Sequence, residues 1–326
     1  MKAGIVGYGN LGKGVKAAIR QNPDIELVGI FTRRDPKALK VKSEDVDVVN
    51  VDQAEDYISK IDVMLLCGGS ATDLPVQGPK FASMFNTVDS YDNHERIPDY
   101  YEEMNRVAKE NGTLSAVSIG WDPGLFSMNR MLAGAILPEG RDYTFWGSGV
   151  SQGHSDALRR IEGVKDAVQY TIPIEETIDR VRDGENPDLT ASDGHRRECY
   201  VVVEDGADKA RIEDEIKSMP NYFEHYETNV NFVTKKELNR DHSEMPHGGF
   251  VIRSGRTGFD KEKNQTYEFG LDLESNPEFT ASVLVAYARA VNRLSKEGAA
   301  GAKTVFDIPL CYLSPKSDTE LRAEML

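Results

Sequence analysis

Two aspartates that follow predicted strands are the side chains best suited to acid–base chemistry. Asp92 lies in the stretch Asp89-Ser-Tyr-Asp-Asn-His94, and Asp122 lies in Trp121-Asp-Pro-Gly124. Carboxylates at such positions could hold an ammonium ion or accept its proton. A loop Asx-turn explains Asp92 equally well, and an aspartate before proline often caps a helix. The residues alone therefore leave the roles of both aspartates open.

Further polar residues that could bind a ligand occur later in the chain. A polar cluster runs from Phe145 to Asp156, Arg197 precedes a predicted strand, His247 lies among glycines and Asn276 precedes a proline. Arginine can clamp a carboxylate through two hydrogen bonds. A charged strand edge is the simpler explanation of Arg197, and a lone histidine is more often structural than catalytic. These residues are candidates for substrate binding, and the sequence does not decide between the two interpretations.

Several kinds of chemistry and several kinds of partner are disfavoured. The six histidines show neither H-E-x-x-H nor mixed His/Cys spacing, so we expect no metal site, and no nucleophile elbow is present. The net charge of −15 argues against nucleic acid or an anionic membrane as partner. The three cysteines have no paired spacing, and no signal peptide or membrane-spanning run is evident. We therefore expect a cytoplasmic protein.

The elements that would position these side chains begin with a glycine turn. A short apolar run from Ala3 to Val6 meets Gly7-Tyr-Gly-Asn-Leu-Gly12, and a predicted helix follows from Leu11 to Arg20. In this spacing Gly7 allows a tight turn, Gly9 lets the backbone approach a pyrophosphate, and Gly12 lets the helix pack on the strand. The phosphates would lie at the helix N-terminus. The pattern predicts dinucleotide binding.

The end of the second predicted strand indicates which dinucleotide binds. Proteins that bind NAD usually place an acidic residue there, whereas this chain has Thr32-Arg33-Arg34. Two guanidinium groups and a hydroxyl suit the 2′-phosphate of NADP. The alternative is that Asp35 reaches the ribose, but it lies one position later and is followed by proline. We therefore predict NADP.

The wider pattern predicts two domains. Strands alternate with helices from Met1 to about Gly120, which is typical of a Rossmann-type doubly wound parallel sheet in an α/β domain of residues 1–120. Residues 121–279 are richer in strands and predict a C-terminal α+β domain with a mostly antiparallel sheet. The Ala-rich helix and tail of residues 280–326 are expected to pack back on the first domain.

Five segments resemble those of one known family: Gly7–Gly12, Asp89–His94, Gly120–Gly124, Ser151–Arg159 and Met245–Gly249. Together they resemble the meso-diaminopimelate D-dehydrogenases, and the similarity runs from Ala3 to about Pro315. This resemblance implies a homodimeric NADP-dependent enzyme whose C-terminal domain binds substrate and forms the dimer. Such an enzyme oxidatively deaminates the D-centre of meso-2,6-diaminopimelate to L-2-amino-6-oxopimelate and ammonia, reversibly, and the product cyclises to tetrahydrodipicolinate on a route to lysine.

The resemblance also implies roles for individual residues. Asp92 and Asp122 would act at the reacting D-end, near Trp121, Trp146, Gln152 and Gly153. The far L-end would be held by Thr171, Arg197, His247 and Asn276. The cofactor groove would comprise Gly7, Tyr8, Gly9, Asn10, Leu11, Thr32, Arg33, Arg34, Cys67, Gly68, Gly69, Ser70, Ser90, Tyr91, Gly120, Trp121 and Pro123. Gly68 departs from the larger residue expected there, such as Met, and could loosen this groove.

Three other functions remain compatible with the sequence. A loose clamp at the L-end would give a broader NADP-dependent D-amino acid dehydrogenase. A dihydrodipicolinate reductase-like enzyme would share the two-domain plan. A non-catalytic NADP-sensing protein would need the glycine turn but not the acidic and arginine clusters, and their presence disfavours it.

Overall fold

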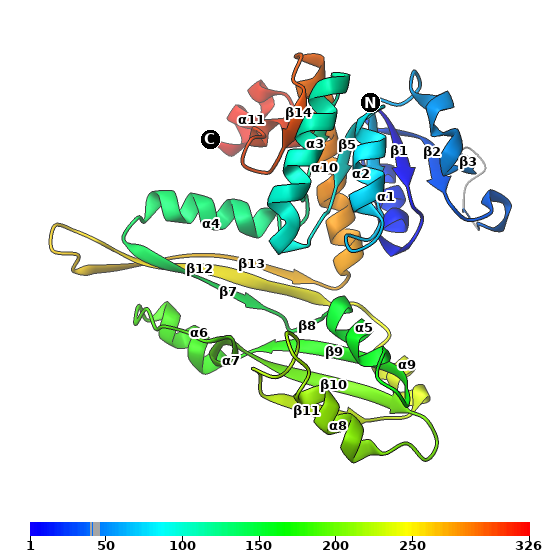
Figure 1. Ribbon diagram of the computed structural model, residues 1–326. Coiled ribbons are helices and arrows are strands. Elements are labelled where there is room, and N and C mark those ends of the chain that lie inside the picture. The colour runs from blue at the N-terminus through cyan, green and yellow to red at the C-terminus, as the bar shows by residue number, and fades with distance from the viewer. Residues whose placement is uncertain (40, 42–45) are drawn as a thin grey trace. The chain divides into compact units, whose positions relative to one another are not determined.

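The computed structural model describes residues 1–39, 41 and 46–326. Contacts within the chain divide it into two units, Met1–Met128 with Pro277–Leu326, and Asn129–Asn276 (Figure 1). The boundaries expected from the sequence lay near residues 120 and 279. Each unit has its own sheets and its own hydrophobic cores.

The first unit is built on a seven-stranded sheet in which all paired strands are parallel. Its strands are β1 (Lys2–Val6), β2 (Glu26–Thr32), β3 (Asp47–Asn50), β4 (Val63–Leu66), β5 (Asn86–Asp89), β6 (Leu114–Ala116) and β14 (Gly301–Lys303). The strand order is β14-β6-β5-β4-β1-β2-β3. Strands β2 and β3 are added on one side of β1 and the later strands on the other, so the topological switch point lies between β1 and β4. This confirms the predicted doubly wound fold, whose ligands bind at that switch point.

Helices cover both faces of this sheet (Figure 1). One core joins α1 (Asn10–Arg20) and α10 (Asn276–Lys296) to β1, through side chains such as Ile5, Ile19 and Leu284. The opposite core joins α2 (Leu74–Ala82) and α3 (Ile97–Asn111) to the strands, through Phe81 and Met104. Apolar side chains on both faces explain why these strands read as continuous hydrophobic runs.

Short helices complete the first unit. They are η1 (Pro36–Ala38), η2 (Val51–Tyr57), η3 (His94–Arg96), η4 (Leu310–Leu313) and α11 (Asp318–Met325). No helix of the described residues is long and apolar enough to cross a bilayer. Within those residues, no cluster of three histidine, cysteine or acidic side chains is arranged to hold a metal ion.

The second unit contains two sheets. The first has the order β11-β10-β9-β8, with β8 (Gly149–Val150), β9 (Val164–Pro173), β10 (His195–Val203) and β11 (Thr228–Phe232). The second has the order β13-β12-β7, with β7 (Gly140–Trp146), β12 (His247–Thr257) and β13 (Lys263–Leu273). Every pair is antiparallel except β10 with β11. The mostly antiparallel character was predicted, but the division into two sheets was not.

Helices cover these sheets in turn. They are α4 (Leu125–Ile136), which begins in the first unit, α5 (Gln152–Arg159), α6 (Glu175–Arg182), α7 (Ala191–Gly194), α8 (Lys209–Lys217) and α9 (Lys235–Asp241). Leu158 of α5 and Ile212 of α8 pack on Val201 of β10. Leu238 of α9 belongs to a separate core that contains Val202 of the same strand. Neighbouring residues of β10 thus point to opposite cores, as the strand period of two requires.

Candidate active site

The glycine turn has the geometry that a bound pyrophosphate requires. Gly7 has φ +90° and donates its N–H to the Phe31 carbonyl at 2.8 Å. A Cβ at Gly12 would lie 2.1 Å from the Gly7 carbonyl oxygen, so only glycine fits there. A Cβ at Gly9 would have no heavy atom within 4 Å, which leaves the start of α1 open to a ligand. The described residues therefore fit a dinucleotide.

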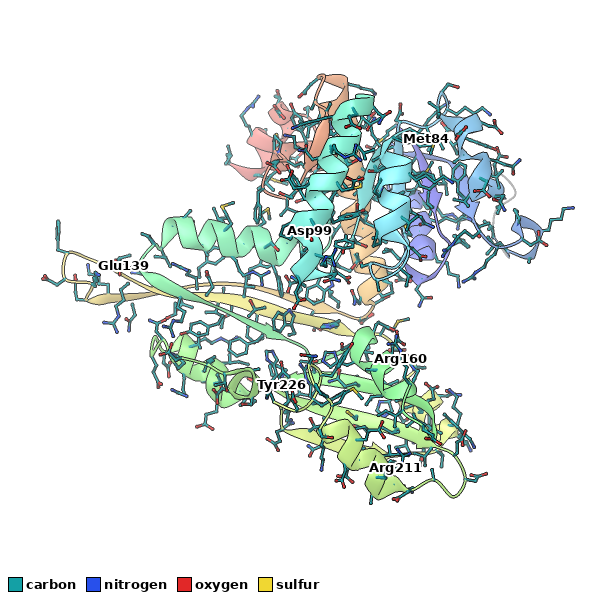
Figure 2. All side chains as sticks on the ribbon, in the orientation of Figure 1. Met84, Asp99, Glu139, Arg160, Arg211 and Tyr226 are labelled. Carbon is teal, nitrogen blue, oxygen red and sulfur yellow. The ribbon has the colours of Figure 1, made fainter. Side chains whose placement is uncertain are left out.

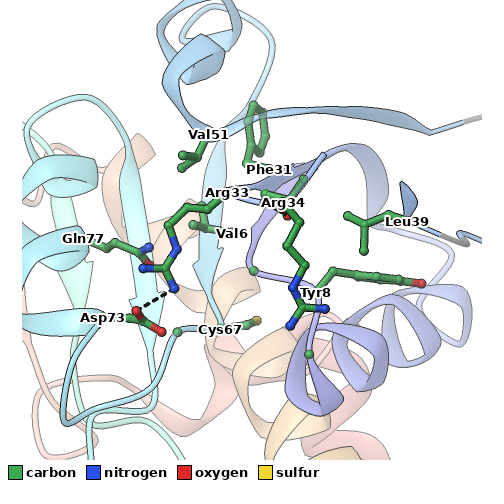
Figure 3. A pocket seen from close by; sticks show the side chains of 14 residues that line it. Val6, Tyr8, Phe31, Arg33, Arg34, Leu39, Val51, Cys67, Asp73 and Gln77 are labelled. Atoms are coloured by element: carbon green, nitrogen blue, oxygen red, sulfur yellow. Dashed lines mark hydrogen bonds and ion pairs between the residues drawn. The ribbon is translucent and has the colours of Figure 1, made fainter. Parts of the chain in front are cut away.

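A cavity of about 200 Å³ opens beside this turn (Figure 3). Three strand ends supply its walls, and its lining includes eight residues expected at the cofactor, namely Gly7, Tyr8, Gly9, Thr32, Arg33, Arg34, Cys67 and Gly68. The remaining expected cofactor residues lie outside the cavity lining, at or beyond the ends of β1, β4, β5 and β6: Asn10, Leu11, Gly69, Ser70, Ser90, Tyr91, Gly120, Trp121 and Pro123.

Both arginines of the second strand end point into this cavity (Figure 3). The Thr32 hydroxyl accepts the Arg34 N–H at 3.0 Å, which fixes the turn that carries them. Arg33 Nη2 lies 2.7 Å from Asp73 Oδ1, and Asp73 Oδ2 accepts the Gly69 N–H at 3.1 Å. The side chain of Arg33 is still 64% exposed and can bind a further anion. Sequence reasoning missed Asp73.

Asp35, the alternative ribose ligand, has another local role. Its carboxylate accepts the Lys37 N–H at 3.0 Å and caps η1.

The loop after β4 is also tighter than the sequence suggested. A Cβ at Gly68 would lie 2.7 Å from the Asp73 Cβ and 2.9 Å from Gln77 Oε1, so these two side chains fill the space that glycine leaves.

A buried carboxylate organises the loop that carries Asp92. Asp89, at the end of β5, is fully buried, and its Oδ1 accepts the N–H groups of Tyr91 at 3.0 Å and Ser118 at 3.1 Å. Its Oδ2 accepts the Tyr100 hydroxyl at 2.9 Å, and the Tyr100 ring stacks on Tyr91. Burial raises the pKa of the Asp89 carboxyl to about 6, although these hydrogen bonds oppose the rise. Asp89 thus joins the loops after β5 and β6.

The two candidate aspartates lie on these loops. The Asp92 N–H donates to the Ser70 hydroxyl at 3.1 Å, which brings the ends of β4 and β5 together. Asp122 lies in the turn before α4, between Trp121 and Gly124, which form a β-bridge. The Trp121 ring is 7% exposed and packs edge-on against Phe126. In this loop the Asx-type hydrogen bond, which the sequence allowed for Asp92, involves Asp89 instead: its carboxylate accepts the Tyr91 N–H.

In the second unit, Arg197 is a buried cation. Arg197 and Thr171 are direct partners across β10 and β9, and Arg197 Nη1 donates to the Thr171 hydroxyl. The side chain is 7% exposed, and its guanidinium carbon lies 3.9 Å from the centre of the Tyr226 ring. Within the described residues its Nε has no hydrogen-bond partner, and no carboxylate contributes to its pKa, which burial lowers.

Two histidines near Arg197 are held neutral. Burial, and then the charge of Arg197, lower the pKa of His154 and of His195 to about 4. His195 Nε2 accepts the Trp146 N–H at 2.8 Å, and its ring stacks on the indole of Trp146. His154 Nδ1 lies 2.7 Å from the Ser151 hydroxyl. Near neutral pH the group formed by Arg197, His154 and His195 therefore has a single positive charge, that of Arg197.

The other expected substrate residues of this unit occupy neighbouring loops. Met245 connects Gln152 and Asn276. Its Sδ accepts a hydrogen bond from Gln152 Nε2 at 2.9 Å, and its carbonyl accepts one from the Asn276 N–H at 3.1 Å. His247 begins β12, and a Cβ at Gly149 would lie 2.6 Å from its Cα. Gly153 lies in the first turn of α5 with open space at its Cβ position. Thr171 pairs with Gly149 of β8 and with Arg197 of β10. Trp146 of β7 pairs with Gly249 of β12, two positions after His247.

This fold and cavity define the class of the protein: a two-unit protein with a Rossmann-type dinucleotide-binding unit. Residues 120–275 match the family model described as the diaminopimelic acid dehydrogenase C-terminal domain. The chain is 63% identical to the meso-diaminopimelate D-dehydrogenase of Ureibacillus thermosphaericus, covering 100% of this chain and 99% of that protein. It is 49% identical to the enzyme of that name from Corynebacterium glutamicum, covering 99% and 98%. The chain belongs to the meso-diaminopimelate D-dehydrogenase family.

Solved structures agree with this assignment. A Clostridium tetani meso-diaminopimelate dehydrogenase variant with DAP matches with a TM-score of 0.95 and 55% identity, covering 100% of this chain and 99% of that one. The C. glutamicum DAP dehydrogenase in complex with DAP matches at 0.93 and 47%, with the same coverage. An engineered D-amino acid dehydrogenase bound to NADP⁺ matches at 0.87 and 46%, again with that coverage.

Proposed function

We propose that this protein catalyses the reversible NADP-dependent oxidative deamination of the D-centre of meso-2,6-diaminopimelate. The products are L-2-amino-6-oxopimelate, which cyclises to tetrahydrodipicolinate, and ammonia. The observation that carries the proposal is the buried guanidinium of Arg197, which has an unused Nε and no carboxylate partner in the described chain. A buried charge is costly unless it is paired, so this arrangement suits a ligand that brings its own carboxylate.

The preference for NADP follows from the strand end after β2. Arg33 and Arg34 both line the cavity beside the glycine turn, and a guanidinium binds a phosphate monoester bidentately. Thr32 orients the turn through its hydroxyl. Bound NADP would accept a hydride from the D-centre of the substrate.

The second unit supplies the groups that would hold the L-end of the substrate. Arg197 would clamp the L-carboxylate, with its planar group fixed by Thr171. His247 and Asn276 would complete recognition of the L-amino acid end. Holding one end of a symmetrical molecule selects which of its two centres reaches the cofactor, which is catalysis by orientation. An isomer that leaves Arg197 unpaired would be rejected.

At the reacting end, Asp92 and Asp122 are the candidates for proton transfer. Each carboxylate can hold the D-ammonium group and accept its proton before the amine is oxidised. Trp146, Gln152 and Gly153 would contact the same end of the substrate. The hydrogen bonds of Asp89 fix the loop that carries Asp92, and so hold that carboxylate ready.

Two properties complete the proposal. We expect a homodimer, an expectation that rests on the family resemblance and that light scattering of the purified protein would test. The second candidate function is a broader D-amino acid dehydrogenase. The engineered enzyme of that name, at 46% identity, supports it because the same fold carries that activity.

The test is to incubate the protein with NADP⁺ and each stereoisomer of diaminopimelate while following NADPH absorbance. The proposal predicts turnover with the meso isomer, little with the D,D isomer and none with the L,L isomer. Comparable turnover of simple D-amino acids would favour the broader enzyme. No turnover of the meso isomer would contradict the proposal.

A further inference from the structure

The ring of Tyr226 covers the buried guanidinium. Tyr226, labelled in Figure 2, lies in the loop that leads into β11, and its N–H donates to the Phe223 carbonyl at 2.9 Å. The Arg197 N–H donates to the Glu227 carbonyl at 2.8 Å, and Arg197 pairs with Thr228 across the parallel β10–β11 ladder. The backbone of this loop is therefore registered against Arg197 itself.

Side-chain contacts also hold the guanidinium in place. Its central carbon lies 3.9 Å from the centre of the Tyr226 ring, so the ring covers it. Nη1 is held by the Thr171 hydroxyl, while Nε has no hydrogen-bond partner within the described residues. The ring contact, the hydrogen bond to Thr171 and a side-chain hydrogen bond to Tyr226 together restrict both the position and the rotation of this planar group. Its Nε is the donor without a partner in the described chain.

The surroundings make the ring contact important. Arg197 is nearly fully buried. His154 and His195, whose pKa values are lowered by burial and by the charge of Arg197, are neutral near pH 7. A cation–π contact is strongest when it is desolvated, as here. Fixing a long side chain before the ligand arrives also removes an entropic cost from binding.

We propose that Tyr226 is a positioning residue that sets the affinity of the enzyme for the second carboxylate of its substrate, by holding the Arg197 guanidinium flat against its ring. This inference deepens the proposed function and rests on it. Tyr226 acts through Arg197 and should leave the chemical step unchanged.

The variants are Tyr226→Leu, which removes the aromatic face, and Tyr226→Phe, which keeps it. The matched control is Tyr200→Leu, at a tyrosine of β10 whose ring stacks on His242. For each variant, kcat, the KM for meso-diaminopimelate and the KM for NADP⁺ are measured. The dissociation constant for meso-diaminopimelate is measured by calorimetry, which does not depend on turnover.

Tyr226→Leu should raise the substrate KM and the dissociation constant roughly 5- to 30-fold. Its kcat and its KM for NADP⁺ should stay within about twofold of wild type, since a contact at the non-reacting end holds the bound substrate and the transition state equally. Tyr226→Phe keeps the ring but loses the hydroxyl that hydrogen-bonds to Arg197, so its loss of affinity should be clearly smaller than that of Tyr226→Leu. Tyr200→Leu should stay close to wild type. In an Arg197→Met background, Tyr226→Leu should have no further effect, because contacting residues that act as a unit are not additive.

Several results would overturn the inference. These are an unchanged substrate affinity in Tyr226→Leu, an equal loss in Tyr226→Phe, or a full additional loss in the Arg197→Met background. A fall in kcat with a matching rise in the NADP⁺ KM would instead indicate general damage to the fold and would also count against it. If the wild type binds meso-diaminopimelate but reduces no NADP⁺, the proposed reaction fails while the calorimetric comparison still decides the role of Tyr226. A wild type that binds no meso-diaminopimelate would overturn both.

Discussion

Replacing Asp89 by asparagine should stabilise the first unit at neutral pH, although the residue lies at the heart of a hydrogen-bond network. Asparagine keeps the shape of the side chain. Its oxygen can accept both N–H groups that Asp89 Oδ1 accepts, and its amide can donate to the Tyr100 hydroxyl, whose proton then turns away. Only the negative charge is lost, and no cation contributes to the pKa of Asp89.

The magnitude follows from the shifted pKa. Burial raises the pKa of Asp89 from 3.8 to about 6, and at about 1.36 kcal/mol per pKa unit this corresponds to about 3 kcal/mol. Below about pH 4 the carboxyl is protonated in the folded and the unfolded chain, so it costs nothing. Between pH 4 and 6 the unfolded chain ionises first, and the free energy of unfolding falls as pH rises. Above pH 6 the wild type carries the full penalty, which Asp89→Asn removes.

The chain offers a selective probe for the measurement. It has two tryptophans, Trp121 in the first unit and Trp146 in the second, so a Trp146→Phe background leaves a reporter of the first unit. Urea unfolding is followed by Trp121 fluorescence at several pH values from 4 to 8. Asp99→Asn is the control, since Asp99 is exposed and pairs only with Arg96 among the described residues.

The expected difference between Asp89→Asn and its parent is near zero at pH 4 and up to about 3 kcal/mol in favour of asparagine at pH 7.5. Asp99→Asn should show no such trend. A variant that is less stable than the parent at pH 7.5, or that keeps the parent's slope between pH 4 and 6, would refute the reasoning. Its ionised carboxylate would then be worth more than its burial costs.

Local patterns predicted the frame of the first unit well. The glycine turn, the apolar strands and the arginines after β2 are each encoded within a few neighbouring residues, and the turn and strand end line one cavity. Strands β3 and β14 were missed because they are short and depend on pairing with distant strands. The polar cluster predicted from Phe145 to Asp156 ends within a helix, α5, because Leu158 and its neighbours bury one face against β10.

The residues that support the site could not be found in the same way. Asp73 acts on Arg33, and Tyr226 acts on Arg197, through contacts between residues far apart in the sequence. Asp89 was visible within its motif, but its burial and its bond to Ser118 depend on the packing of β5 beside β6. Spacing identifies side chains that can react, whereas the side chains that hold them are defined only by the fold.

Three further predictions follow from the site. Arg33→Ala and Arg34→Ala should each raise the KM for NADP⁺ roughly 10-fold or more and leave the KM for NAD⁺ nearly unchanged, because each removes a charge-assisted contact to the 2′-phosphate; equal effects on both cofactors would contradict this. Gly68→Met should displace Asp73 and raise the KM for NADP⁺ several-fold with little effect on the substrate KM, and an unchanged NADP⁺ KM would be inconsistent with the crowding at Gly68. The pKa of His195 is lowered from 6.5 to about 4, so its contribution to the free energy of unfolding is complete above pH 6.5. That contribution should fall by about 3 kcal/mol as the pH falls to 4, because the unfolded chain binds the proton first. In urea unfolding, the free energy of unfolding of His195→Gln should therefore decline less with falling pH than that of wild type.

The central claim is that this chain removes hydride from the D-centre of meso-diaminopimelate and gives it to NADP⁺. The most direct measurement uses meso-diaminopimelate that carries deuterium on Cα of the D-centre alone. After one turnover with NADP⁺, the reduced cofactor and the cyclised product are analysed by mass spectrometry. The account predicts deuterated NADPH and a product that has lost its deuterium. Unlabelled NADPH together with a product that retains the label would place the reaction at the L-centre and contradict it.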